Sequence, residues 1–155
     1  MPKLRILFLL SILFFVVASV HAQQEYTTDS RQAEQAFKEA LQQYRLREHQ
    51  KALGSVNKAL RADEDFIEAY ILKGQIFEEQ KDYRRAIDMY RRAIEMDASF
   101  YTRLLYNTGE LEFRTGQYEK ARQHFLRYRE REETGPIKEK QAEQRIEECE
   151  FALKQ

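Results

Sequence analysis

The 155-residue sequence predicts an all-α protein, and three observations support this fold class. From Ala33 onward, apolar residues recur at intervals of three and four positions, which is the period of an amphipathic helix. The chain contains only 5 Gly and 2 Pro, too few for the many turns of an all-β fold. Similar segments return after 34 or 35 residues, which indicates a helical repeat.

The N-terminal 22 residues have the layout of a secretory signal peptide. Lys3 and Arg5 precede an apolar run at 6–20, and short side chains precede a cut after Ala22. This run is short of the roughly 20 residues that span a bilayer. We therefore expect cleavage and export to the periplasm, with an uncleaved N-terminal anchor as the alternative. Residues 23–30, QQEYTTDS, are expected to form a polar linker that ends in an N-cap at Asp29 or Ser30.

Three helical hairpins are predicted after the linker, at about 33–65, 67–100 and 102–133. The second and third copies align with a shift of 35 residues, and the first and second with a shift of 34. Small residues at fixed positions let helix axes approach to about 8–10 Å, and aromatic residues fill the wider gaps beside them. The residues assigned to these structural positions are Ala40, Ala52, Ala59, Tyr70, Gly74, Tyr83, Ala86, Tyr90, Ala93, Gly109, Tyr118, Ala121 and Phe125.

This pattern resembles the tetratricopeptide repeat, whose unit of about 34 residues is a helix–turn–helix. The match is densest in the second copy, at Tyr70, Gly74, Phe77, Tyr83, Ala86, Tyr90, Ala93 and Asp97. The resemblance implies an α-solenoid of three hairpins. Two departures stand out: the usual proline after each second helix is absent, and Tyr128 occupies the place of Ala59 and Ala93.

A C-terminal capping helix is predicted at 136–154, where Pro136 is placed to open it. One apolar face, formed by Ala142, Ile146, Cys149 and Leu153, would cover the last hairpin, and the remaining faces are polar. The stretch 142–154, AEQRIEECEFALK, and the signal ending His21-Ala22-Gln23 also resemble exported Bacteroidetes-type envelope proteins. In those proteins a tetratricopeptide domain precedes a β-propeller-like domain and an OmpA-like domain. Neither later domain occurs in these 155 residues, so peptidoglycan binding is not implied.

Composition argues against several classes of function. The 26 basic and 26 acidic residues balance, and removal of Lys3 and Arg5 leaves a net charge of −2, which does not favour nucleic acid. One Cys forms neither an internal disulfide nor a four-cysteine zinc site. We expect no metal, no cofactor and no small-molecule substrate. Membrane contact is expected only through a partner or an uncleaved signal peptide.

Catalytic residues are not evident in the sequence. His49 and His124 occupy non-equivalent repeat positions and are interpreted as solvated, while Cys149 is interpreted as a core residue. The acidic pairs at 78–79, 132–133 and 147–148 are interpreted as solvated faces, because neighbours on a helix point about 100° apart. The clusters Arg84-Arg85 and Arg91-Arg92 are interpreted as surface ion pairs. The protein is therefore predicted not to be an enzyme.

The remaining functional feature is a surface. In stacked hairpins the first helix of each pair lines the concave face. The residues expected there are Phe37, Leu41, Arg45, Ile71, Gln75, Glu78, Glu79, Arg103, Tyr106, Asn107, Glu110 and Arg114. Phe37 and Leu41 could instead pack against the linker or the next hairpin. The lysines and asparagines with which some family members clamp a C-terminal carboxylate are largely missing. A mixed-charge groove of this kind predicts a scaffold for envelope proteins, or alternatively a chaperone-like holder of exported peptides.

Overall fold

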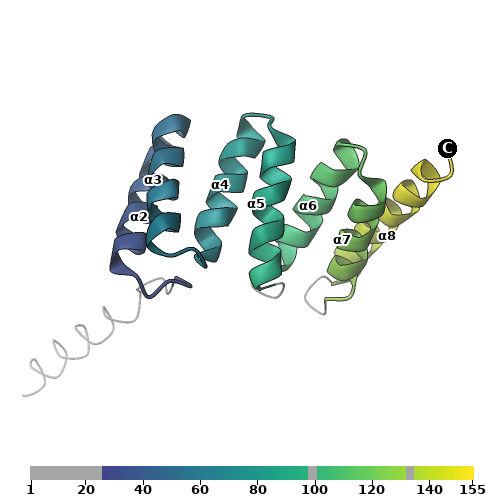
Figure 1. Ribbon diagram of the computed structural model, residues 1–155. Helices are drawn as coiled ribbons and strands as arrows, with labels where there is room; N and C mark the ends of the chain where they lie inside the picture. The colour runs from purple at the N-terminus through teal and green to yellow at the C-terminus, as the bar shows by residue number, and fades with distance from the viewer. Residues whose placement is uncertain (1–25, 98–100, 132–134) are drawn as a thin grey trace, which may run out of the picture.

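The computed structural model describes residues 26–97, 101–131 and 135–155. Within these residues the fold is entirely helical, which confirms the predicted fold class. The helices are α2 (Arg31–Arg45), α3 (His49–Ala62), α4 (Ile67–Glu79), α5 (Tyr83–Met96), α6 (Thr102–Arg114), α7 (Tyr118–Arg129) and α8 (Gly135–Ala152). They stand side by side in a row from α2 at one end to α8 at the other (Figure 1).

Each consecutive pair of helices, α2 with α3, α4 with α5 and α6 with α7, packs as an antiparallel hairpin (Figure 1). The three turns share one backbone conformation, because Arg47, Lys81 and Gly116 all have a positive φ, at 58°, 61° and 76°. A residue in this left-handed region ends a helix and lets the chain reverse. The repeat in the sequence is therefore also a repeat in backbone geometry.

The pairing of Gly74 and Gly109 with aromatic rings explains why glycine stands at these positions. A Cβ atom on Gly74 would lie 2.3 Å from Cε1 of Tyr90, and one on Gly109 would lie 2.8 Å from Cε1 of Phe125. Both distances are well below van der Waals contact. The Tyr90 and Phe125 rings therefore occupy the space that the missing side chains leave.

The N-terminal segment is more than a polar linker. The ring of Tyr26 packs edge-on against Phe37 and Phe66, at centroid distances of 5.3 and 5.9 Å. The hydroxyl of Thr27 accepts a hydrogen bond from the backbone N–H of Ile67 at 3.2 Å, which caps the first turn of α4. The N-cap of α2 is Ser30, whose side chain accepts from Ala33. Residues 26–30 are thus docked onto the first two hairpins.

Helix α8 packs along α7 and covers the end of the last hairpin. Ala142, Ile146 and Cys149 are buried, as the sequence predicts, and burial raises the pKa of the Cys149 thiol to about 11. Leu153 corrects the prediction, because it lies beyond the helix and is 48% exposed. A helix ending at Ala152 cannot carry Leu153 on its apolar face.

Two further properties concern only the described residues. No helix among them is both long and apolar enough to cross a bilayer, and none of their His, Cys, Asp or Glu side chains gather in groups of three that could hold a metal ion. The predicted signal peptide at 1–22, the start of the linker and the acidic pair at 132–133 lie outside these residues.

Candidate binding surface

Four of the residues expected on the concave face come together in one groove. Gln75, Glu78 and Glu79 project from α4, and Arg114 projects from the end of α6. The groove has a volume of about 420 Å³ and is completed by Tyr44 of α2, by Lys81 in the turn before α5 and by Tyr83, the first residue of α5. We call it the α4–α6 groove; its lining residues are Tyr44, Gln75, Glu78, Glu79, Lys81, Tyr83 and Arg114.

The acidic side of this groove is already bonded within the chain. Glu79 accepts a hydrogen bond from the Tyr44 hydroxyl at 2.7 Å and lies 3.0 Å from Nε2 of His49. Glu78 accepts from the Tyr90 hydroxyl, also at 2.7 Å. Burial, reinforced by the hydrogen bond to Glu79, raises the pKa of Tyr44 to about 12, and burial raises that of Tyr90 as well. The two carboxylates therefore have structural partners, which the interpretation of 78–79 as a solvated face did not foresee.

The basic side of the groove is formed by Lys81 and Arg114. The Arg114 guanidinium lies over the Tyr83 ring, 5.2 Å from its centroid, and Nη1 donates to the Tyr83 hydroxyl at 3.3 Å. Lys81 is exposed at the turn before α5. Within the described part of the chain, neither Lys81 nor Arg114 forms an ion pair. Together with the exposed amide of Gln75, they give the groove two cations without an ion-pair partner and a neutral hydrogen-bonding group, opposite the carboxylates Glu78 and Glu79.

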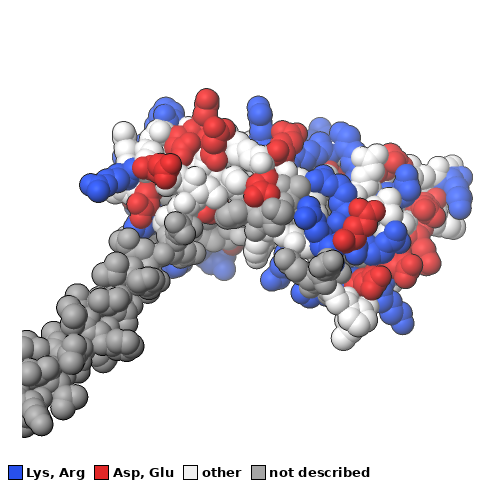
Figure 2. Space-filling model, turned by 90° about the horizontal axis from the view of Figure 1, so that it is seen from below, with Lys and Arg blue, Asp and Glu red and all other residues white. Residues whose placement is uncertain are grey.

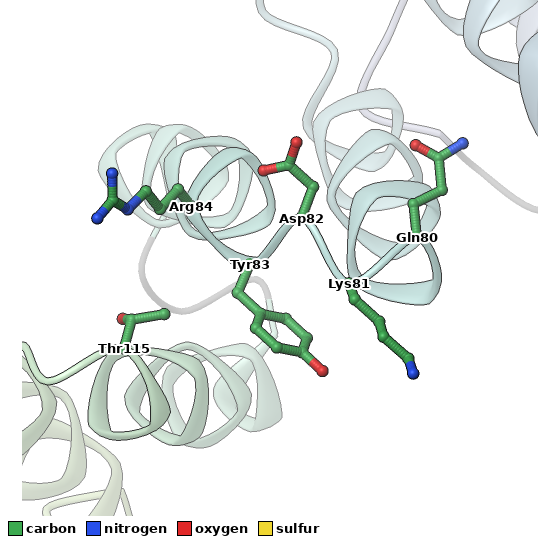
Figure 3. Close-up of a pocket in the computed structure, with 6 residues that line it drawn as sticks. All are labelled: Gln80, Lys81, Asp82, Tyr83, Arg84 and Thr115. Atoms are coloured by element: carbon green, nitrogen blue, oxygen red, sulfur yellow. The ribbon is translucent and has the colours of Figure 1, made fainter.

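A second opening adjoins the groove at the turn between α4 and α5, with a volume of about 460 Å³. It shares Lys81 and Tyr83 with the α4–α6 groove. Figure 3 shows that the Lys81 and Tyr83 side chains extend side by side, whereas Arg84 extends the opposite way. Asp82 is ion-paired with Arg85. The side chains around this opening do not converge on one point, so it widens the edge of the groove and is not a separate site.

Three other expected residues lie near the start of α6 and line a different pocket: Arg103, Tyr106 and Asn107. This pocket has a volume of about 300 Å³ and is closed by α8. We call it the α6–α8 pocket; its lining residues are Arg103, Tyr106, Asn107, Tyr128, Lys138 and Gln141. The contribution of α8 to a pocket is not predicted by the sequence.

The remaining expected residues do not form a common site. Phe37 is buried beneath Tyr26 and beside Phe66, so it packs against the N-terminal segment and is not open to a partner. Glu110 is ion-paired with Arg145 of α8. The others are distributed as follows: Leu41 and Ile71 are half-buried against the core, and Arg45 is exposed.

A buried polar cluster between the second and third hairpins was missed. Glu112 is 0% exposed and accepts hydrogen bonds from Nε and Nη2 of Arg91, at 2.8 and 2.6 Å. Its other oxygen lies 2.6 Å from Nδ1 of His124. The interpretation of His124 as solvated and of Arg91 as part of a surface ion pair is therefore wrong. The alignment of the repeats carries a signal for this cluster, because Glu112 and His124 stand where the second copy has the apolar residues Phe77 and Met89.

Charge on the exterior is mixed. Figure 2 shows basic and acidic side chains interspersed over the visible face, without a large area of one sign. On this face the distribution matches the balanced composition, and the described residues do not present the extended basic surface that a nucleic-acid phosphate backbone requires.

Comparison with known proteins identifies the repeat. A family model described as tetratricopeptide repeat matches residues 37–99 and 71–136. Among curated proteins, anaphase-promoting complex subunit 3 of Schizosaccharomyces pombe is 32% identical over 81 residues, covering 52% of this chain and 12% of that protein. Photosystem I assembly protein Ycf3 of Acaryochloris marina is 39% identical over 75 residues, covering 46% of this chain and 45% of that protein. The chain thus spans less than half the length of these relatives.

Solved structures with the same fold are similar over most of the chain. The first tetratricopeptide domain of Spaghetti (RPAP3) bound to the HSP90 peptide SRMEEVD has a TM-score of 0.66 at 18% identity, covering 83% of this chain and 98% of that one. The Yersinia enterocolitica type III secretion chaperone SycD in complex with a peptide of the translocator YopD has a TM-score of 0.63 at 17% identity, covering 76% and 92%. At these identities the similarity shows a shared fold.

Proposed function

This chain belongs to the tetratricopeptide repeat family, and on that premise we propose that it is a non-catalytic protein–protein interaction scaffold of the cell envelope. The observation that carries the proposal is the α4–α6 groove, where side chains from three hairpins surround about 420 Å³ of open space. Lys81 and Arg114 supply charge, Gln75 supplies an amide, and Tyr83 offers an aromatic edge. Such a groove suits an extended or helical segment of another protein.

The assignment to the envelope rests on the sequence. The basic start, the apolar run at 6–20 and the short side chains before position 23 support export. The resemblance of 142–154 to exported envelope proteins supports the same location. Cell fractionation with a periplasmic marker tests this part. Recovery of the chain with a mass that lacks residues 1–22 is expected, and recovery from the cytoplasm at full mass would contradict it.

Partner capture tests the groove itself. Lys81→Glu combined with Arg114→Glu reverses the charge of both groove cations and leaves the hydrogen-bonded carboxylates Glu78 and Glu79 in place. We expect quantitative mass spectrometry of an envelope extract to show a partner that the unaltered protein retains and the double variant loses. Rim charges act mainly through association rate, so the loss should be greatest at low salt.

Lys58 provides the matched control for this experiment. It is exposed on α3, forms no ion pair in the described structure, and does not line the groove. Pairing Lys58→Glu with Arg61→Glu on the same helix reproduces the change of net charge away from the groove. Equal capture by the groove variant and this control would contradict binding in the α4–α6 groove.

A chaperone-like holder of exported peptides is the second candidate. Two solved complexes of chaperones with the same fold support it. SycD in complex with a YopD peptide, and PcrH in complex with the chaperone-binding region of PopD, have TM-scores of 0.63 and 0.64 with this chain. A holder should bind many unrelated extended peptides weakly, whereas a scaffold should bind one partner tightly. Titration against a panel of unrelated unfolded polypeptides separates the two. Similar micromolar affinities for all the polypeptides of the panel, each lowered to the same extent by Lys81→Glu with Arg114→Glu, would favour the holder.

A further inference from the structure

We propose that the α6–α8 pocket receives an acidic side chain from the interior of the partner's bound segment. This inference rests on the proposed function and adds the chemistry and spacing of the partner. Its basis is that the pocket gathers two cations and two side-chain amides around an aromatic floor, with no acidic side chain among its described lining residues. The cations are Arg103 from α6 and Lys138 from α8, and the amides are Asn107 and Gln141.

Neither cation is neutralised within the described structure. Arg103 and Lys138 are both exposed and form no ion pair with any described residue. Glu110, on the same helix as Arg103, pairs with Arg145, and burial together with this carboxylate raises the pKa of the Tyr106 hydroxyl. Glu143 of α8 lies 3.9 Å from Nη1 of Arg129. Glu139 follows Lys138 directly and therefore points about 100° away around the helix. Among the described residues, the pocket consequently holds two positive charges without an acidic partner, and an acidic group of a bound segment would compensate them.

The floor of the pocket favours a carboxylate over a nucleic-acid base. The rings of Tyr106 and Tyr128 lie 5.1 Å apart, and Tyr106 also packs 5.3 Å from Phe125. Tyr128 is buried, and burial raises the pKa of its hydroxyl. Because these rings pack against each other, they do not present the open faces on which bases stack. A small anionic group that accepts hydrogen bonds from guanidinium, ammonium and amide donors fits better.

The position of the pocket relative to the α4–α6 groove predicts a spacing. Arg103, Asn107 and Arg114 all lie on α6, separated by four and seven residues, which places them on one face of the helix. At 1.5 Å per residue, Arg114 is roughly 10 Å from Asn107 and roughly 16 Å from Arg103 along the axis. An extended peptide covers this distance in about three to five residues. The acid should therefore stand three to five positions from the residue that occupies the groove.

Selection of peptides from a random library tests this inference. We would display 12-residue peptides at the N-terminus of a phage coat protein, so that no peptide offers a free C-terminal carboxylate. Selection would be carried out in parallel on the unaltered protein, on Lys138→Glu with Arg103→Glu, and on Lys140→Glu with Arg127→Glu. Lys140 and Arg127 are exposed on α8 and α7 and line neither cavity, so the last variant matches the change of net charge.

The expected result is enrichment of Asp or Glu at a fixed spacing from a shared anchor residue on the unaltered protein and on the control variant. The pocket variant should lose the acidic preference while it still selects the anchor. For one enriched peptide, the pocket variant should bind about tenfold more weakly, which corresponds to roughly 1.4 kcal/mol. Replacement of the peptide's acid by its amide should remove most of that difference.

Other outcomes would overturn the inference in distinguishable ways. Enrichment of an anchor without any acid, or with an equal acid preference on the pocket variant, removes the α6–α8 pocket from the mechanism and leaves the proposed function standing. Failure to enrich peptides on any of the three proteins contradicts the proposed function, and this inference with it. Displacement of an enriched peptide by a short oligouridylate at equal concentration would assign the pocket to nucleic acid and overturn the proposal.

Discussion

The second and third hairpins place different chemistry in the same geometry. Phe77 and Met89 of the second hairpin correspond, with a shift of 35, to Glu112 and His124 of the third. The first pair belongs to an apolar cluster, whereas the second is a buried contact of 2.6 Å between a carboxylate and an imidazole. At a second pair of positions the exchange is the opposite, with polar residues in the second hairpin and apolar residues in the third.

That opposite exchange involves the residues beside the helical glycines. Tyr90 of the second hairpin donates to Glu78, whereas their equivalents in the third hairpin, Phe125 and Phe113, are both apolar and share one cluster. Each position alone looks like an arbitrary replacement. Taken as pairs, both exchanges replace donor and acceptor together, so that no buried polar group is left unsatisfied. Between these two hairpins, polar and apolar residues are therefore exchanged as pairs that face each other across two helices, and not one residue at a time.

The buried cluster is expected to give the largest effect. Glu112→Leu removes the acceptor of both Arg91 and His124 and should lower the free energy of unfolding by about 3 kcal/mol, the lower end for a broken buried ion pair because Arg91 can still reach water. Glu112→Phe with His124→Met, which copies the second hairpin, should recover most of this loss. Chemical denaturation measures both. A loss below 1 kcal/mol for the single variant would mean that the cluster is not a cooperative unit.

Glycine packing should give the next largest effect, and it should affect both hairpins. A Cβ on Gly74 meets the Tyr90 ring at 2.3 Å, so Gly74→Ala should cost about 1–3 kcal/mol, with Gly74→Leu costing more. Gly109→Ala should cost less, because its Cβ meets the Phe125 ring at the longer distance of 2.8 Å. Thermal melting distinguishes the two variants.

Gly54 serves as the control for the glycine series. It lies within α3 and has no atom within 4 Å of an added Cβ. Gly54→Ala should therefore stabilise the protein by about 0.5–1 kcal/mol, the usual preference of a helix for alanine. Equal melting temperatures for Gly74→Ala and the unaltered protein would show that the Tyr90 ring yields without cost.

The hydroxyl exchange should give the smallest effect. Tyr90→Phe removes the hydrogen bond to Glu78 and should cost about 1 kcal/mol. Phe125→Tyr introduces a hydroxyl beside Phe113, which offers no acceptor, and should also cost about 1 kcal/mol or slightly more. Combining Phe125→Tyr with Phe113→Glu should restore part of the loss, as a double-mutant cycle would measure. Additive effects of the two changes would show that the third hairpin does not form the hydrogen bond that joins Tyr90 and Glu78 in the second.

Much of the fold could be predicted because its signals are local and repeated. The three-and-four spacing indicated the helices, and the shift of about 34 residues indicated the hairpins. Ala86 and Tyr90 are buried, and the Tyr90 ring lies against Gly74. The surface was predicted less completely. Gln75 and Arg114 do line one groove, but Phe37 is covered by Tyr26, a contact between segments that no periodicity connects.

The sequence by itself determined the helices, their pairing into hairpins and the small residues at which they meet, because each depends on a period within one repeat. Only the tertiary structure decided which polar groups find each other. The contacts of Arg91 with Glu112 and of Glu110 with Arg145 join residues 21 and 35 positions apart on different hairpins or on the capping helix. Hydrogen bonds and ion pairs act over about 3 Å, and that proximity is set by how whole helices stack.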